Sequence, residues 1–445
     1  MYQKDVIAAI ATPPGVGAIA IIRISGLNLE SIFKKLTKRE DFVDRRASFL
    51  GIYGKNGDVI DKCMVIYIKG PNSYTGEDII EINCHGGDLM PKLIISEIIS
   101  IKGVRLATAG EFSRRAFLNN KIDLIQAESI ASLIVSDSIN MKKINLKNSM
   151  GFISKQVESI SSGLYELLTV IEHELDFNED EIEHITIKKI SNELNDVKEN
   201  LNNILNSSLY SKKLNDGYKV VLCGRPNVGK SSLFNAIVGT DRVIVSEEIG
   251  TTRDNVEMLF SLDGIKIKLI DTAGYMKTSR GVDQEAVKKT HQAINDADLL
   301  LVLDESNPYK ELQHLKLNSQ QNYLLVLTKS DLNINKKNVN NCIKLSTVTG
   351  LGLDLLLKNI STFLSTSISF NIDKDPIITS NRQASIINSS IEIINTSINI
   401  LNDDCDMVVI STMIRRVADL LGELIGVVYN EEVLNNIFTD FCVGK

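Results

Sequence analysis

The 445-residue sequence predicts an N-terminal α+β region and a helical region, with a doubly wound α/β domain inserted in the helical region. Three observations predict this arrangement. Short β-rich runs and turns fill residues 1–118, and apolar residues then recur at helical spacing. From Tyr218 to about residue 370, short apolar runs alternate with helix-length segments. Helical spacing resumes after Asp375, so one interrupted helical domain is favoured over two separate ones.

The composition is that of a soluble globular protein, with 43% hydrophobic and 24% charged residues. No apolar run is long enough to cross a bilayer, and the N-terminus lacks the pattern of a secretory signal. The six cysteines are scattered, which favours reduced thiols over a disulfide framework or a zinc site. We therefore expect a cytoplasmic protein without a membrane segment. The net charge of −7 argues against a broad basic surface for nucleic acid.

Within residues 1–118, two strand-like runs in "RASFLGIYGKNGDVIDKCMVIYIKG" flank Asn56 and Gly57, a pair that favours a hairpin turn. One or two helices are expected beside these strands, one of them at "PKLIISEIISIKG". Residues 119–214 and 373–445 form the helical region. Its clearest stripe, which predicts the buried face of a bundle helix, is Ile153, Val157, Ile160, Leu164, Leu167, Ile171 and Leu175.

A phosphate-binding loop marks the α/β domain, residues 215–372. "GRPNVGKS" follows the strand run "KVVLC" and opens the helix "SSLFNAIVG", which is the context that this motif requires. Gly224 and Gly229 let backbone N–H groups point at the phosphates, and Lys230 adds a charge for the β and γ oxygens. The Ser231 hydroxyl is the predicted Mg²⁺ ligand.

Four further segments predict that the nucleotide is GTP. Thr252 in "GTTRD" and Asp271 in "DTAG" stand where the two switch segments of GTPases contact Mg²⁺ and the γ-phosphate. Asp331 in "TKSD" can accept two hydrogen bonds from guanine, and "STVTG" supplies the last loop around the base. The predicted GTP contacts are Asn227, Val228, Gly229, Lys230, Ser231, Ser232, Ser246, Glu247, Glu248, Ile249, Gly250, Thr251, Thr252, Asp271, Thr272, Ala273, Gly274, Thr328, Lys329, Asp331 and Ser346.

The usual device for positioning the attacking water is missing. Tyr275 follows "DTAG" where small GTPases carry a glutamine. Either hydrolysis is slow or other groups position the water. Asn227 offers a neutral oxygen beside the phosphates, where a monovalent cation would do part of the work of an arginine finger.

Four stretches together resemble the bacterial tRNA-modification GTPase family MnmE (TrmE): "YTGEDIIEINCHGG", "GEFSRRAFLNNKIDLIQAES", the inserted GTPase motifs and the final "FCVGK". The resemblance runs end to end. It implies a folate-binding and dimerisation domain at 1–118, a helical domain at 119–214 and 373–445, and a G domain at 215–372. It also implies a K⁺-assisted GTP hydrolase that acts with the flavoprotein MnmG (GidA) in a heterotetramer.

The implied reaction adds an aminomethyl or carboxymethylaminomethyl group to carbon 5 of the wobble uridine of certain tRNAs. The one-carbon unit would come from 5-formyl- or methylene-tetrahydrofolate. Carried over by motif, the folate site is Arg23, Glu81, Lys121 and Lys445. Mg²⁺ would be held by Ser231 and Thr252, and K⁺ by Asn227, Ser246, Glu248 and Thr251. The catalytic candidates are Lys230, Thr252, Asp283 and Cys442.

The sequence departs from the family pattern at three positions. Asp283 stands where members usually carry a water-positioning glutamate, which predicts slow or rewired hydrolysis. Thr328 replaces an asparagine in the guanine motif, and Thr347 replaces an alanine in the last loop.

The final segment is predicted to be docked, with anchors at Ile437, Phe438 and Phe441 and with Gly444 close to the folate pocket. Cys442 is open between a catalytic thiol and a buried or pocket-lining one. The rival to a modifying enzyme is an RNA-binding or ribosome-assembly GTPase switch without modifying activity. A third alternative is an assembly scaffold that has lost GTPase activity.

Overall fold

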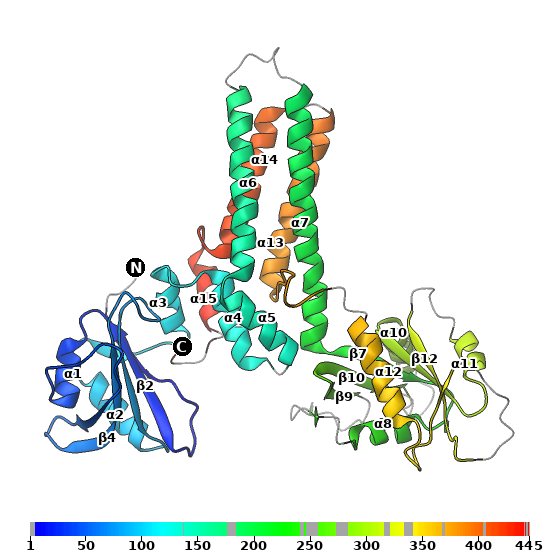
Figure 1. The fold of residues 1–445 in the computed structure, drawn as a ribbon, viewed down its shortest axis with the longest axis horizontal. Coiled ribbons are helices and arrows are strands. Elements are labelled where there is room, and N and C mark those ends of the chain that lie inside the picture. Colours follow the sequence, from blue (N-terminus) through cyan, green and yellow to red (C-terminus); the bar gives the residue numbers. More distant parts are fainter. Residues whose placement is uncertain are drawn as a thin grey trace. The chain divides into compact units, whose positions relative to one another are not determined.

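The computed structural model describes residues 5–136, 138–175, 184–240, 244–245, 257–272, 284–315, 321–332, 341–366, 370–403, 406–439, 441 and 444. The chain divides into two compact units. Unit 1 combines Met1–Ile134, Lys147–Val197 and Ser389–Lys445. Unit 2 combines Val135–Leu146 and Lys198–Asn388. Each unit contains one β-sheet with helices packed against it (Figure 1).

The sheet of unit 1, drawn in blue in Figure 1, has six strands in the order β3-β4-β5-β2-β1-β6. Helices α1 (Glu30–Thr37) and α2 (Met90–Ile99) pack on one face, where alternate strand residues form an apolar core. The predicted hairpin is confirmed, because β3 and β4 pair antiparallel on either side of its turn. The strands are β1 (Val6–Ile10), β2 (Ile19–Gly26), β3 (Ser48–Tyr53), β4 (Val59–Ile68), β5 (Asp78–His85) and β6 (Val104–Leu106).

A third helix, α3 (Glu111–Leu118), lies in this region, where one or two helices were predicted. Its Arg115 is only 1% exposed, because acidic side chains surround the guanidinium. Arg115 pairs with Asp5 at 2.8 Å, with Glu77 at 3.1 Å and with Glu111 at 3.1 Å. Buried charges are tolerated when they are paired and hydrogen-bonded in this way. The apolar pattern of "EFSRRAFL" is interrupted, so the pattern alone does not indicate a helix. The ion pairs of Arg115 help to hold this helix in place.

This cluster predicts loss of stability in acid. Burial opposes ionisation of Glu111, but hydrogen bonds from Arg105, the Thr108 backbone and Arg115 outweigh it and lower the pKa from 4.5 to about 2. A carboxyl with a depressed folded-state pKa stabilises the fold above its unfolded pKa and stops doing so as pH falls through the folded value. We expect the protection of the α3 amides against hydrogen exchange, relative to their intrinsic exchange rates, to fall as the pH drops from 4.5 to about 2.

Glu111→Gln should weaken that pH response, because this side chain no longer titrates. Asp5 should account for the remainder, because burial raises its pKa but hydrogen bonds from Arg105 and Arg115 outweigh this effect and lower it. Glu40→Gln is the matched control, since Glu40 pairs with Lys34 at an exposed site and such pairs contribute little. An unchanged pH response in Glu111→Gln would contradict the assignment of the acid response to this carboxyl.

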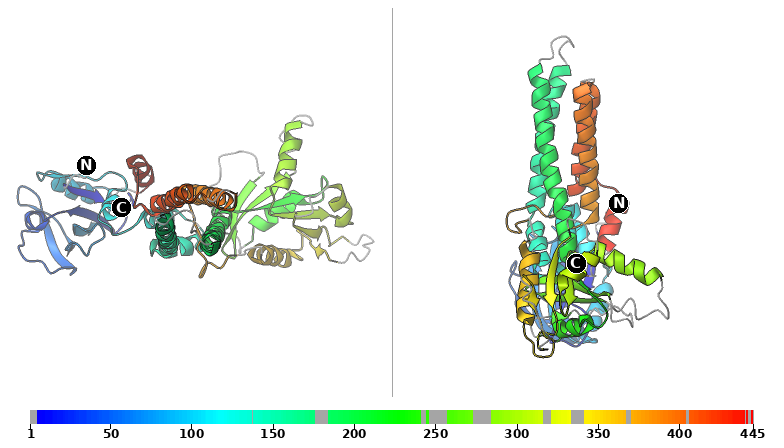
Figure 2. Two further views of the ribbon diagram at one scale, coloured as in Figure 1. Left: turned by 90° about the horizontal axis from the view of Figure 1, so that it is seen from above. Right: turned by 90° about the vertical axis from the view of Figure 1, so that its right-hand side faces the viewer.

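The helical part of unit 1 buries the predicted stripe along α6 (Phe152–Leu175). Ile153, Val157, Leu164, Leu167 and Ile171 are buried, whereas Ile160 is half-buried and Leu175 is 40% exposed. Figures 1 and 2 show α14 (Met407–Ile425) running alongside α6. The other helices of the helical region are α4 (Leu124–Val135), α5 (Ile139–Ser149), α7 (His184–Asp216), α13 (Asn381–Asp403) and α15 (Glu431–Thr439). Most of α5 belongs to unit 2, and α7 and α13 run from one unit into the other.

The sheet of unit 2 has seven strands in the order β13-β12-β11-β7-β10-β9-β8. Five neighbouring strands, β13 to β10 in that order, are parallel, and β9 and β8 join antiparallel. The strands are β7 (Tyr218–Cys223), β8 (Ile244–Val245), β9 (Glu257–Leu262), β10 (Ile265–Asp271), β11 (Leu299–Asp304), β12 (Tyr323–Leu327) and β13 (Ile343–Lys344).

Both faces of this second sheet are buried. Val220 and Leu222 of β7 point into one apolar cluster, and Val221 and Cys223 point into another. Helices α8 (Lys230–Val238) and α12 (Leu353–Thr366) contribute to the first cluster. Helices α10 (Gln284–Asn295) and α11 (Pro308–His314) contribute to the second. The predicted doubly wound α/β fold is confirmed. Across the described ranges, the structure contains no helix long and apolar enough to cross a membrane.

Candidate functional site

The phosphate loop joins the carboxyl end of β7 to α8. Gly224, Asn227 and Gly229 have positive φ angles of 147°, 63° and 101°, which curl the backbone. A Cβ atom on Gly224 would lie 2.4 Å from the carbonyl oxygen of Leu303, so only glycine lets the loop pass β11. The Lys230 ammonium lies inside the curl and donates to the carbonyl oxygens of Gly224 at 2.5 Å and Arg225 at 2.7 Å. This is the geometry of a phosphate cradle with its lysine in place.

Two oxygen ligands for a metal ion meet beside this loop. Ser231 is the second residue of α8, and Asp271 ends β10, which pairs parallel with β7. The Ser231 hydroxyl donates to the Asp271 carboxylate at 2.7 Å. A hydroxyl and a carboxylate at a phosphate-binding loop are the hard oxygen donors that Mg²⁺ prefers. The donor set therefore fits Mg²⁺.

The predicted guanine reader and the last loop also meet. β12 and β13 pair in parallel, so "TKSD" and "STVTG" leave the same edge of the sheet. Ser330 bridges them, because its hydroxyl donates to the Leu345 carbonyl at 2.8 Å. Ser346 is fully buried, and its hydroxyl accepts from the Thr349 N–H at 3.3 Å. The Thr328 hydroxyl is buried and has no hydrogen-bond partner among the described residues.

Two acidic residues that sequence reasoning missed hold both nucleotide loops. Glu311 of α11 pairs with Arg225 of the phosphate loop at 3.2 Å. Glu305, just after β11, pairs with Lys329 of the guanine motif at 2.8 Å. The end of β11 is thus linked to both loops. Neither glutamate belongs to a motif, and only the pairing of distant positions in the fold could have revealed them.

Many predicted switch and terminal residues lie outside the described residues, so their predicted roles stay predictions. They are Ser246, Glu247, Glu248, Ile249, Gly250, Thr251, Thr252, Ala273, Gly274, Asp283, Cys442 and Lys445.

A second polar site lies on the sheet of unit 1. Arg23 of β2 stands directly opposite Glu81 of β5, and its Nη2 and Nε bind the same carboxylate oxygen at 2.7 and 2.9 Å. Its Nη1 donates to the carbonyl oxygen of Gly444 at 3.1 Å. The Phe112 ring lies 5.9 Å from the guanidinium. Arg23 and Glu81 remain 20% and 22% exposed, so a ligand can reach them.

Lys121, the third predicted folate residue, lies beside Gly76 of the "YTGED" stretch. A Cβ atom on Gly76 would lie 3.2 Å from Cε of Lys121. No interaction joins Lys121 to Arg23 or Glu81 among the described contacts.

The final segment packs as predicted. Leu434, Phe438 and Phe441 are buried in one apolar cluster with residues of α3 and α4, and Ile437 packs against it. Gly444 has a φ of 96°, and a Cβ there would lie 2.7 Å from Cα of Ala11. Only glycine therefore allows so close an approach to the segment that follows β1.

Two family models cover most of the sequence. "GTP-binding protein TrmE N-terminus" matches residues 6–121, and "MnmE helical domain" matches residues 124–442. Relatives named tRNA modification GTPase MnmE match at full length. The one from Clostridioides difficile is 35% identical over 461 residues and covers 100% of both chains. The chain belongs to the MnmE (TrmE) family of tRNA modification GTPases.

Other MnmE relatives agree. The Aquifex aeolicus protein is 35% identical, with 100% of both chains covered. The Thermotoga petrophila protein is 37% identical, with 99% of this chain and 100% of its own covered. Among solved structures, the G domain of the T. maritima FeoB iron transporter is 29% identical and covers 33% of this chain and 98% of its own. Its TM-score is 0.24, which is too low to support a fold assignment. The fold of unit 2 is therefore assigned from the order of the strands in its sheet.

Thr328→Asn should tighten GDP binding about two- to tenfold. The asparagine amide can hydrogen-bond a neighbouring loop, and one such bond contributes about 0.5–1.5 kcal/mol. Affinity is measured by fluorescence titration with a labelled GDP. Thr328→Val is the control, because it removes the unpartnered hydroxyl without adding a donor, and its affinity should stay within about twofold. Equal affinities for the asparagine and valine variants would contradict this role of position 328.

Gly444→Ala should release the final segment from the first strands. The new Cβ would clash with Ala11 and add the cost of a left-handed backbone, about 1 kcal/mol or more. We expect carboxypeptidase to remove the last residues at least about fivefold faster. Gly103→Ala is the matched control, because its φ of 89° is similar and its Cβ would meet open space. Equal release from both variants would show that the contact with Ala11 does not hold the segment.

Proposed function

We propose that this GTPase is K⁺-assisted and, with the flavoprotein MnmG, adds an aminomethyl or carboxymethylaminomethyl group to carbon 5 of the tRNA wobble uridine. The supporting observation is that one chain of this family carries both a phosphate cradle and the Arg23–Glu81 site on a separate sheet. We also propose the division into 1–118, 119–214, 215–372 and 373–445, and a cytoplasmic location where tRNA is available.

The G domain would bind GTP with residues from three strand ends. Lys230 would turn its ammonium from the loop carbonyls to the β and γ phosphates. Ser231 and Asp271 would hold Mg²⁺, directly and through water respectively. Mg²⁺ would neutralise charge on the phosphate oxygens. Asp331 would accept the two guanine N–H groups that adenine does not offer.

The proposed K⁺ site combines Asn227, which the structure describes, with three residues outside the described ranges. Asn227 lies in the curled backbone of the phosphate loop with a φ of 63°, and it is exposed. Ser246, Glu248 and Thr251 would complete the oxygen set. K⁺ would supply the positive charge that an arginine finger supplies elsewhere. Asp283 would position the attacking water from the second switch.

The Arg23 site would bind the folate. A pterin offers donors to a carboxylate, which suits Glu81, and the folate glutamate offers carboxylates to Arg23, Lys121 and Lys445. The ring of Phe112 is fully buried and lies 5.9 Å from the Arg23 guanidinium, so it supports Arg23 from the interior. Tetrahydrofolate would supply the one-carbon unit. Arg23 and Glu81 fit a folate. Their half-buried ion pair, beside an aromatic ring, presents a positive and a negative group together.

The open face of the first sheet is the proposed homodimer surface. Phe49 and Met64 stand opposite each other in β3 and β4 and are 68% and 38% exposed. Ile19 of β2 shares this face and is 64% exposed. An apolar row of this kind favours burial by another protein surface. Arg23 and Glu81 lie on the same face, so a second copy would lie beside the folate site.

Asp283→Glu should raise K⁺-dependent GTP turnover, and Asp283→Ala should lower it. An error of about 1 Å in placing a catalytic group can cost about a hundredfold in rate, and the aspartate is one methylene shorter than the family glutamate. The measurement is steady-state phosphate release in K⁺ and in Na⁺. Glu285→Ala is the control on the same segment and should not change the rate. Equal rates for wild type and both Asp283 variants would discard Asp283 as the water-positioning residue.

Transfer RNA from cells that lack this protein should lose the proposed wobble modification. Mass analysis of nucleosides from purified tRNA measures it, with re-expression of the wild-type chain as the control. Unchanged wobble uridine would contradict the modifying function and favour an RNA-binding GTPase switch.

A further inference from the structure

A cavity of about 830 Å³ lies in unit 2, at the edge of the second sheet away from the phosphate loop. Tyr218 begins β7, Asp298 precedes β11 and Asn322 precedes β12, so these lining residues mark the amino ends of the parallel strands. The phosphate loop follows the carboxyl end of β7. Six residues of strand span about 20 Å, so the cavity and the nucleotide site are separate.

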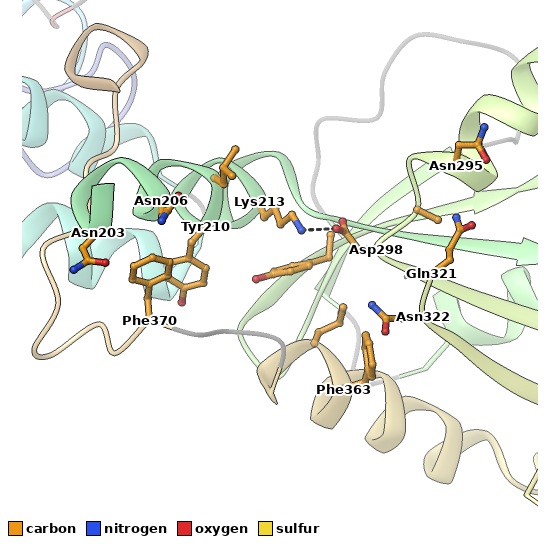
Figure 3. Close-up of a pocket in the computed structure, with 14 residues that line it drawn as sticks. Asn203, Asn206, Tyr210, Lys213, Asn295, Asp298, Gln321, Asn322, Phe363 and Phe370 are labelled. Atoms are coloured by element: carbon orange, nitrogen blue, oxygen red, sulfur yellow. Dashed lines mark ion pairs between the residues drawn. The ribbon is translucent and has the colours of Figure 1, made fainter. Parts of the chain in front are cut away.

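The cavity has aromatic walls. Tyr210 of α7 stacks on Phe370, with ring centroids 5.8 Å apart and planes 19° apart. Figure 3 shows this pair on one side of the cavity and Phe363 of α12 with Asn322 on the other. The cavity volume of about 830 Å³ is large enough for a nucleobase. Aromatic faces bind nucleobases by stacking, and each stacked base contributes about 1–3 kcal/mol.

The polar groups of the cavity are uncharged or paired. Lys213 forms an ion pair with Asp298 at 2.8 Å, and Asp298 also accepts from the Lys219 N–H at 2.9 Å. The remaining polar lining consists mainly of carboxamides, whose donor and acceptor groups suit the edges of nucleobases: Asn203, Asn206, Asn295, Gln321 and Asn322. The Gln321 amide N–H already donates to the Ile294 carbonyl oxygen, so this side chain offers its oxygen. The described lining therefore provides no unpaired cation for a phosphate group.

One lining group lacks a partner. Tyr210 is 6% exposed, and its hydroxyl has no hydrogen-bond partner among the described residues. Burial raises the pKa of Tyr210 to about 12, so the hydroxyl is a donor at neutral pH. A buried donor without an acceptor is costly, and an occupant with a ring carbonyl or ring nitrogen would remove that cost.

We propose that this cavity binds an uncharged nucleobase, held between the aromatic walls and read by the carboxamides and Tyr210. The base belongs either to a free nucleoside or to an unpaired position of an RNA. The proposal does not depend on the tRNA-modifying function, because the cavity lies at the opposite edge of the second sheet from the phosphate loop and none of its described lining residues belongs to the Arg23 site.

The test uses the full chain with saturating GDP and Mg²⁺, so that the nucleotide site is filled. Adenosine, guanosine, cytidine and uridine are titrated separately by calorimetry, and we expect at least one to bind. Tyr210→Phe should weaken that binding about two- to tenfold, and Phe363→Leu about fivefold or more. Tyr165→Phe is the matched control, because Tyr165 is 53% exposed on α6, and it should not change the binding. Unchanged GDP affinity shows that each variant is folded.

A second experiment distinguishes a free nucleoside from an unpaired base of an RNA. An RNA hairpin with an unpaired loop is titrated alone and in competition with the nucleoside that bound. Hairpin binding that Tyr210→Phe weakens and the nucleoside displaces identifies a base of RNA, and nucleoside binding alone identifies a free nucleoside. The proposal is overturned if no nucleoside binds in the presence of GDP, or if neither Tyr210→Phe nor Phe363→Leu weakens the binding.

Discussion

Arg23 joins three segments that are far apart in the sequence. Its guanidinium binds Glu81 across the sheet and the carbonyl oxygen of Gly444, which is 421 residues away. This contact requires Ser389–Lys445 to lie in the same compact unit as Met1–Ile134. The chain therefore leaves unit 1, builds a complete second sheet and returns. The insertion of the α/β block in helical sequence is a consequence of this closure, and the apolar anchors around Phe438 stabilise it.

The nucleotide site depends on a different constraint, the parallel order of the second sheet. β7, β10, β11 and β12 all end at one edge, so four loops of unrelated sequence lie together there. The end of β11 connects them, because Leu303 supports Gly224 while Glu305 and Glu311 pair with the guanine motif and the phosphate loop. These ion pairs are partly exposed, so each contributes little to stability. These ion pairs act instead by fixing the positions of the phosphate loop and the guanine motif.

Local patterns carried most of what the sequence predicted correctly. The Asn56-Gly57 hairpin, the stripe on α6 and the phosphate loop depend on neighbouring residues, and sequence spacing records them directly. The charge cluster around Arg115 was not predictable, because its partners Asp5 and Glu77 come from distant positions. The same holds for Glu305 and Glu311. Helix α3 was missed because it is short and its apolar side, Phe112, Ala116 and Phe117, is interrupted by the buried and ion-paired Arg115.

The central claim is that GTP binding in unit 2 and the Arg23 site in unit 1 serve one reaction on tRNA. The most direct test re-expresses wild type, Lys230→Ala and Arg23→Ala in cells that lack the protein and measures modified wobble uridine by mass spectrometry. The account predicts full restoration by wild type and loss in both variants, with GTP binding kept in Arg23→Ala. Full restoration by either variant would contradict the account.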